Sequence, residues 1–160
     1  MENLSVLLKR LLEHKINFIL VGGYAAVLHG ASQVTHDVDV CAIIDETELV
    51  KLKEALKDLD PKHRMNPNFQ PTLEEYPRQN QKLDNYYLRT KAGVLDIIKK
   101  VDPIGSFEDL NKKAITVELF GFPCKVIALD DLIMAKKYMT RPKDKSVLLE
   151  LLDVKKRLSK

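Results

Sequence analysis

Two aspartates, Asp37 and Asp39, stand one residue apart in an apolar run that continues to Ile44. In a β-strand, residues i and i+2 project from the same face, so both carboxylates are expected to point the same way. Two like charges this close repel unless a cation lies between them, and hard cations such as Mg²⁺ bind carboxylate oxygens. The pattern predicts a metal site. The alternative is an exposed edge strand with two solvated aspartates.

A third candidate ligand is Asp96, in the middle of the apolar segment Val94–Ile98. Three aspartates on neighbouring strands could hold two metal ions about 3.5–4 Å apart, which would activate an attacking oxygen and neutralise a leaving pyrophosphate. We expect Mg²⁺, or Mn²⁺ in its place. We also expect the three carboxylates to converge on one face of a shared sheet.

The glycine pair Gly22-Gly23 stands where the apolar run Phe18–Val21 ends and an alanine-rich helix is predicted to begin. Glycine lets a ligand approach the backbone closely, and a helix N-terminus offers unpaired N–H groups and a positive dipole end. Both features suit phosphate groups. A tight turn that requires a positive φ angle is the purely structural alternative.

The hydrophobic periodicity predicts the elements that would position these residues. Strands are expected over residues 18–21, 34–44, 86–89, 94–99, 114–119 and 123–127. One helix is expected to begin at residue 4, and two more to cover residues 22–28 and 49–59. Two C-terminal helices are expected to end at about residues 138 and 158. The expected helix caps are Asn3, Asp45 and Asp130. The proline-containing segment 60–82 is expected to be a long loop or a lid with at most a short helix.

This order of elements predicts an α/β (α+β) fold, with a small mixed β-sheet flanked by helices and followed by C-terminal helices. We expect one domain over residues 1–160, with a sheet-containing core over about 1–128 and a helical C-terminus over about 129–160.

The composition is that of an ordinary globular protein, with 45% apolar and 31% charged residues among 160. The net charge of +3 is far below that of a dedicated nucleic-acid binder. No window approaches 18 uninterrupted apolar residues, and the N-terminal segment lacks the features of a signal peptide. Cys41 and Cys124 lie in apolar stretches, which favours reduced core thiols. A cytoplasmic protein without membrane association is expected.

Together these motifs resemble the nucleotidyltransferase superfamily, whose fold is similar to the catalytic core of DNA polymerase beta. The stretch "VGGYAAVLHGASQVTHDVDV" is similar to a bacterial branch that includes toxins of abortive-infection type toxin–antitoxin systems. That branch commonly shows G-G-Y-A, a later H-G, and R-x-T-x-D-[IV]-D. Its fourth motif matches Lys136, Arg141 and Asp144, whereas Gln33 replaces its usual arginine and segment 60–82 lies outside the resemblance.

The resemblance implies metal-dependent transfer of a nucleoside monophosphate from a nucleoside triphosphate (NTP) to an acceptor, with release of pyrophosphate. The implied acceptor is tRNA or another RNA, a protein or a small molecule, and a toxin would have an antitoxin partner. The implied catalytic and metal-binding residues are Asp37, Asp39 and Asp96. The implied nucleotide-binding residues are Gly22, Gly23, Tyr24, Thr35 and Lys136.

Other interpretations stay open from the residues themselves. Tyr24 fits a core position as well as a nucleotide contact. Lys136 is expected at an exposed helix position, either contacting phosphate or merely solvated, and Arg141 with Asp144 favours a structural pair at a turn between helices. For the whole protein, the alternatives are a catalytically weak nucleotide-binding or antitoxin-like regulatory module, which Gln33 supports, and a metal-dependent nuclease that uses the same aspartates.

Overall fold

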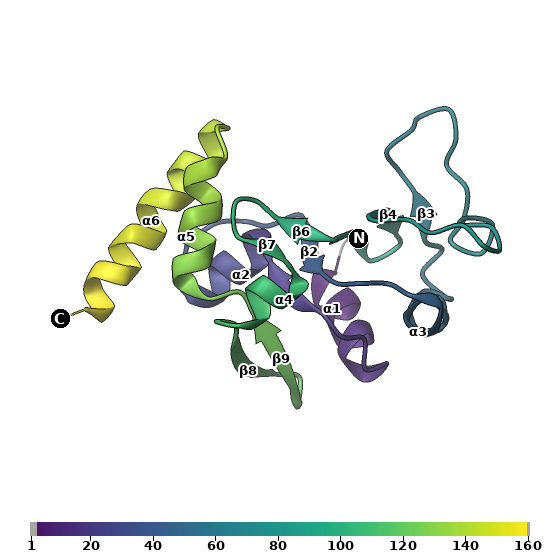
Figure 1. Cartoon of the computed structure of the whole chain (residues 1–160), viewed down its shortest axis with the longest axis horizontal. Coiled ribbons are helices and arrows are strands. Elements are labelled where there is room, and N and C mark those ends of the chain that lie inside the picture. Colours follow the sequence, from purple (N-terminus) through teal and green to yellow (C-terminus); the bar gives the residue numbers. More distant parts are fainter. Residues whose placement is uncertain (1–2, 160) are drawn as a thin grey trace.

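The computed structural model describes residues 3–159 and shows a seven-stranded mixed sheet flanked by helices (Figure 1). The strands are β1 (Ile19–Val21), β2 (Asp37–Cys41), β3 (Lys62–His63), β4 (Tyr86–Thr90), β5 (Gly93–Ile98), β8 (Ile115–Leu119) and β9 (Phe122–Val126). Their order in the sheet is β3-β4-β5-β2-β1-β9-β8. Strands β2 and β5 run parallel, as do β1 and β9, and the other neighbours are antiparallel. The predicted fold class is confirmed.

The helices are α1 (Leu4–Glu13), α2 (Gly22–His29), α3 (Glu46–Leu56), α4 (Phe107–Asn111), α5 (Leu129–Tyr138) and α6 (Pro142–Leu158). Asp45 caps α3 as predicted, because its carboxylate accepts a hydrogen bond from the Glu48 backbone N–H at 2.8 Å. Asn3 occupies the N-cap position of α1 without a side-chain cap bond. The prediction for Asp130 is wrong: α5 begins at Leu129, with Ala128 in the N-cap position, so Asp130 lies in its first turn.

Strand β2 is shorter than the predicted 34–44, because its neighbours pair only with part of that run. Strand β5 pairs with residues 37–41 and β1 with 39–41. Beyond the paired residues the apolar side chains are left outside the sheet, and Val34 and Ile43 are 75% and 58% exposed. The apolar pattern alone therefore overestimated the length of this strand.

Segment 60–82 is more ordered than the predicted loop. It contains β3, which extends the sheet by pairing with β4, and the backbone N–H groups of His63 and Leu73 donate to Pro71 and Pro61. Further elements without a sequence prediction are the small sheet of β6 (Lys100–Val101) and β7 (Gly105–Ser106) and the short helix α4.

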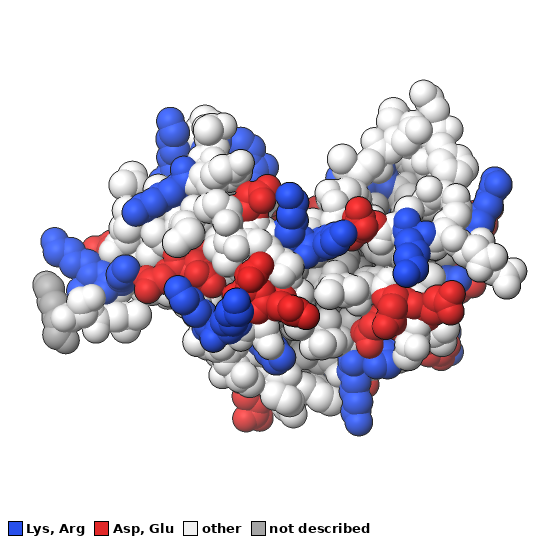
Figure 2. All heavy atoms as spheres, viewed as in Figure 1, with Lys and Arg blue, Asp and Glu red and all other residues white. Residues whose placement is uncertain are grey.

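Helices α5 and α6 form a hairpin at the left end of the molecule in Figure 1, and segment 64–84 projects at the right end. In the same orientation, the outline of the molecule is notched between these two parts, and acidic and basic side chains alternate across the visible face (Figure 2). Cys41 and Cys124 are both buried and free. Within residues 3–159, no helix combines the length and apolar character needed to cross a bilayer.

Candidate active site

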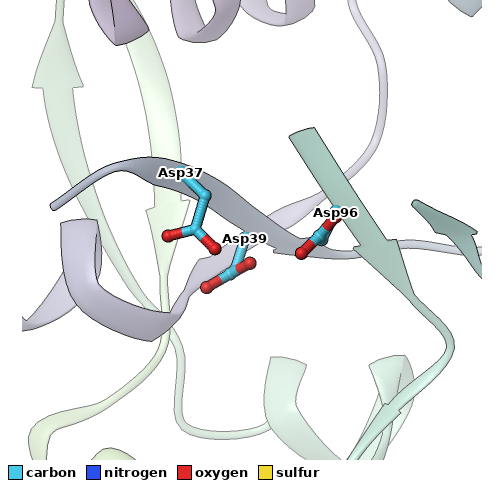
Figure 3. A group of neighbouring side chains, drawn as sticks. All are labelled: Asp37, Asp39 and Asp96. Atoms are coloured by element: carbon cyan, nitrogen blue, oxygen red, sulfur yellow. The ribbon is translucent and has the colours of Figure 1, made fainter. Parts of the chain in front are cut away.

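Three carboxyl groups converge on one face of the sheet where β2 lies beside β5. The parallel register places Asp39 directly opposite Asp96, with Asp37 one alternation earlier on β2. Figure 3 shows the three side chains pointing to the same side, toward one another. One carboxylate oxygen from each residue lies within 4.8 Å of the other two. The expected convergence is confirmed, and the catalytic roles of these residues stay predictions.

The electrostatics of this cluster favour a cation. Burial, followed by the charges of Asp37 and Asp96, raises the pKa of Asp39 to about 7, while Lys136 and Arg64 act in the opposite direction. Burial is also the largest cause of the raised pKa of Asp96. A divalent cation would remove the repulsion, and three carboxylate oxygens at this spacing suit a hard ion such as Mg²⁺ or Mn²⁺. The residues present therefore fit the implied metal.

Gly22 lies against the cluster because β1 passes directly into α2 beside β2. Val21 pairs with Asp39, and Gly22 follows with a φ angle of +67°, a conformation that favours glycine. A Cβ atom at this position would stand 2.3 Å from Oδ2 of Asp39. At Gly23 a Cβ atom would stand 3.0 Å from Oγ1 of Thr35, a side chain that can move. Only the first glycine is required by both backbone conformation and space.

Replacing Gly22 by alanine should therefore lower stability by about 1–3 kcal/mol and displace the Asp39 carboxylate. Thermal unfolding and Mg²⁺-dependent stabilisation by NTP are the measurements. Gly23→Ala is the matched control and should cost less than about 1 kcal/mol. Equal losses in the two variants would contradict the special role of Gly22.

The other predicted nucleotide-binding residues around α2 make bracing contacts. Thr35 Oγ1 donates to the backbone carbonyl of Asp37 at 3.0 Å, and Gln33 Nε2 donates to the carbonyl of Gly23 at 3.4 Å. The Gln33 bond ties the segment before β2 to the first turn of α2, and the Thr35 bond ties that segment to the start of β2. Tyr24 is partly buried and packs against the core. Contacts of Gly23, Tyr24 and Thr35 with a nucleotide stay predictions.

The expectation that Lys136 is exposed is wrong. Its side chain is buried at 7% exposure, and its Nζ atom lies 3.1 Å from Oδ1 of the fully buried Asp144. Arg141 Nε donates to the same carboxylate at 2.8 Å, which confirms the predicted pair at the turn between α5 and α6. Lys136 and Arg141 nevertheless line one pocket with Gly22 and Asp39. They bring positive charge to the edge of the acidic cluster.

Arg64 is a site residue that sequence reasoning missed. Its Nη2 atom donates to both carboxylate oxygens of Asp96, at 2.8 and 2.7 Å. Arg64 follows β3, and its backbone N–H donates to the carbonyl of Tyr87, the residue opposite Asp96 on β4. The guanidinium carbon lies 5.8 Å from the Tyr87 ring centroid. The one sequence signal was the alternation of Lys62 and Arg64, which was hidden in a segment expected to be a loop.

A mixed sheet with flanking helices, a glycine turn and clustered carboxylates defines the nucleotidyltransferase fold class. The chain belongs to the family described as nucleotidyltransferase of unknown function (DUF6036), whose model matches residues 1–103. The match includes β1, α2, β2 and β5, which carry Gly22 and all three aspartates. No curated protein sequence matches the chain significantly.

Solved structures share the fold at low sequence identity. The crystal structure of the lincosamide antibiotic adenylyltransferase LnuA, bound to lincomycin, has a TM-score of 0.60 and 17% identity, covering 92% of this chain and 93% of LnuA. A putative nucleotidyltransferase from Thermotoga maritima has a TM-score of 0.53 and 18% identity, and the match covers 92% of this chain and 91% of that protein. An antigenic nucleotidyltransferase-like protein from Paracoccidioides brasiliensis has a TM-score of 0.55 and 15% sequence identity. The match covers 94% of this chain and 72% of that protein.

Proposed function

We propose that this protein is a metal-dependent nucleotidyltransferase that transfers a nucleoside monophosphate from an NTP to an acceptor hydroxyl or phosphate. The observation that carries this proposal is the convergence of Asp37, Asp39 and Asp96 beside Gly22, at the N-terminus of α2. The family assignment supports the same reaction class.

In this proposal, Asp37 and Asp39 would hold Mg²⁺, and Asp96 would hold a second ion. Bound metal supplies charge neutralisation for the triphosphate and lowers the pKa of the acceptor hydroxyl. The N–H groups at the start of α2 bind phosphate oxygens. The acceptor oxygen forms a bond to the α-phosphorus, the bond to the bridging oxygen breaks, and pyrophosphate leaves. Asp96 takes the acceptor proton, and the positive charges of Lys136 and Arg141 stabilise the charge that develops on the phosphates.

The acceptor class has two sources of support. The motif resemblance to toxin nucleotidyltransferases favours an RNA or protein acceptor and an antitoxin partner. LnuA, whose fold this chain shares over nearly its whole length, is an antibiotic adenylyltransferase seen with lincomycin, which supports a small-molecule acceptor. A nuclease or a catalytically weak nucleotide-binding module would use the same residues.

One labelling experiment separates these functions. The protein is incubated with Mg²⁺ and each of the four NTPs labelled at the α-phosphate, together with total RNA, a protein extract or a panel of hydroxyl-bearing small molecules. Label transfer that an Asp37→Asn, Asp39→Asn double variant abolishes supports the proposal. RNA fragmentation without transfer indicates a nuclease, and NTP binding without either reaction indicates a binding module.

A further inference from the structure

A strip of basic residues continues outward from Asp96 on the same face of the sheet. In the β4–β5 register, Tyr87 lies opposite Asp96 and Arg89 lies opposite Val94. Alternation along each strand places Arg89 and Tyr87 on the face that carries Asp96. Lys62 on β3 is the partner of Arg89, so it faces the same way. The strip begins at Arg64, which contacts Asp96, and with neighbouring strands about 4.8 Å apart it reaches Lys62, two strands from β5, at about 10 Å.

The strip carries more positive than negative charge. A pocket here is lined by four cations, Lys62, Arg64, Arg89 and Lys91, and one carboxylate, Asp60.

Among residues 3–159, neither Arg89 nor Lys91 has an ion-pair partner, and Lys62 has only Asp60 at 3.6 Å. Arg64 is matched by Asp96. A mild average charge therefore conceals one concentrated basic surface.

A second pocket adjoins this strip and is lined mainly by rings and amides. Its walls include His63, Met65, Asn66, Phe69, Tyr76, Asn85 and Tyr87. Phe69 is 51% exposed and held edge-on against Tyr76, with the ring centroids 5.7 Å apart. His63 lines both pockets, and Tyr87 joins this one to the Asp96–Arg64 contact. The exposed Phe69 ring and the neighbouring amide groups offer stacking and hydrogen bonding together.

We propose that β3, β4 and segment 64–85 form the acceptor site and that it binds single-stranded RNA. The basic strip would hold backbone phosphates, while the aromatic pocket would stack an unpaired base and contact its edge through Asn66 or Asn85. A small apolar acceptor would leave the basic strip unused, and an inorganic polyanion would leave the rings unused. The RNA hydroxyl that reaches Asp96 is then the nucleotide acceptor, a role that rests on the proposed function.

The test measures binding without catalysis. A fluorescein-labelled single-stranded RNA of about 12 nucleotides is titrated with protein in metal-free buffer at several salt concentrations. A Lys62→Gln, Arg89→Gln double variant should bind about 10- to 100-fold more weakly, with a salt slope reduced by about 1.4 for two lost phosphate contacts. Phe69→Ala should weaken binding about 5- to 100-fold without changing the salt slope.

The chain offers matched controls for both changes. Lys9→Gln with Lys156→Gln removes two exposed lysines on α1 and α6, and Phe120→Ala removes a ring that is 44% exposed at the β8–β9 turn. These variants should bind the RNA as the unaltered protein does. Equal weakening in the control lysine variant would overturn the proposal, because it would indicate diffuse charge attraction.

The outcome is separable from that of the proposed function. Weaker RNA binding by the Lys62→Gln, Arg89→Gln variant and by the Phe69→Ala variant supports the RNA site even if no nucleoside monophosphate is ever transferred. Transfer to a protein or a small molecule, with RNA binding unchanged in these variants, overturns the RNA site while the transferase survives. In the positive case, the labelled nucleoside monophosphate is transferred from NTP to the same RNA with release of pyrophosphate, and the Lys62→Gln, Arg89→Gln variant raises KM for RNA with little change in KM for NTP.

Discussion

Replacing Asp39 by asparagine should lower nucleotide transfer by about 10²- to 10⁴-fold, or about 3–5 kcal/mol of transition-state stabilisation. Asp39 is the partner of both Val21 and Asp96 in the sheet, so its carboxylate lies at the junction of the glycine turn and the acidic cluster. The amide keeps the shape but removes the charge that a divalent ion requires. The measurement is kcat/KM with labelled NTP at saturating Mg²⁺. Asp153→Asn, in an exposed residue of α6 outside both the cluster and the proposed acceptor site, is the control and should be nearly silent.

The same substitution should have a pH-dependent effect on stability. The pKa of Asp39 is raised from 3.8 to about 7, mainly by burial, so the native state binds this proton more tightly than the unfolded chain. The resulting stabilisation is complete below about pH 4 and is lost as the pH rises through 7. At pH 8 without metal, Asp39→Asn should therefore be more stable than the unaltered protein by about 1–3 kcal/mol. Mg²⁺ with NTP should raise the Tm of the unaltered protein only. A large loss of stability in metal-free Asp39→Asn would indicate a structural role instead.

Replacing Lys136 by alanine should destabilise the protein by about 2–4 kcal/mol, a fall in Tm of about 5–15 °C. The lysine is buried against Asp144, which has no exposed surface and would keep only Arg141 as a partner. Removing one member of a buried ion pair leaves the other charge uncompensated. Lys137→Ala, at the neighbouring exposed position of α5, should change Tm little.

A double variant distinguishes this ion pair from a general packing effect. Lys136→Met combined with Asp144→Leu removes both charges and should recover most of the lost stability, because well-packed apolar residues replace a buried pair at little cost. If Lys136→Ala and Lys137→Ala have the same Tm, the buried pair contributes nothing to stability.

Short sequence motifs were sufficient to predict the residues at the centre of the candidate active site. The glycine pair marks the turn from β1 into α2, and the alternation of Asp37 and Asp39 within an apolar run places both carboxylates on one face. Asp96 was identified by its apolar neighbours, and the register of β2 with β5 then brings it opposite Asp39. Each of these inferences depends on residues close together in sequence.

Contacts between distant segments could not be predicted in the same way. Arg64 reaches Asp96 only because β3 adds to the edge of β4, and that register has no local signature. Lys136 is buried only because the turn between α5 and α6 returns Asp144 to it. A helix sequence with lysines at 136 and 137 does not indicate which of the two faces the core. Both errors concern charged side chains whose environment is set by a partner from another element.

The position of β1 between β2 and β9 has a consequence for synthesis of the chain. Strand β1 is fully apolar and buried on both sides, yet its parallel partner β9 comes more than a hundred residues later. While the ribosome is still producing residues 102–121, the three aspartates are already available, but one hydrogen-bonding edge of β1 has no partner. An unpaired, apolar strand edge is a template for aggregation. We therefore expect fragments that end before β9 to aggregate when they are expressed as isolated domains.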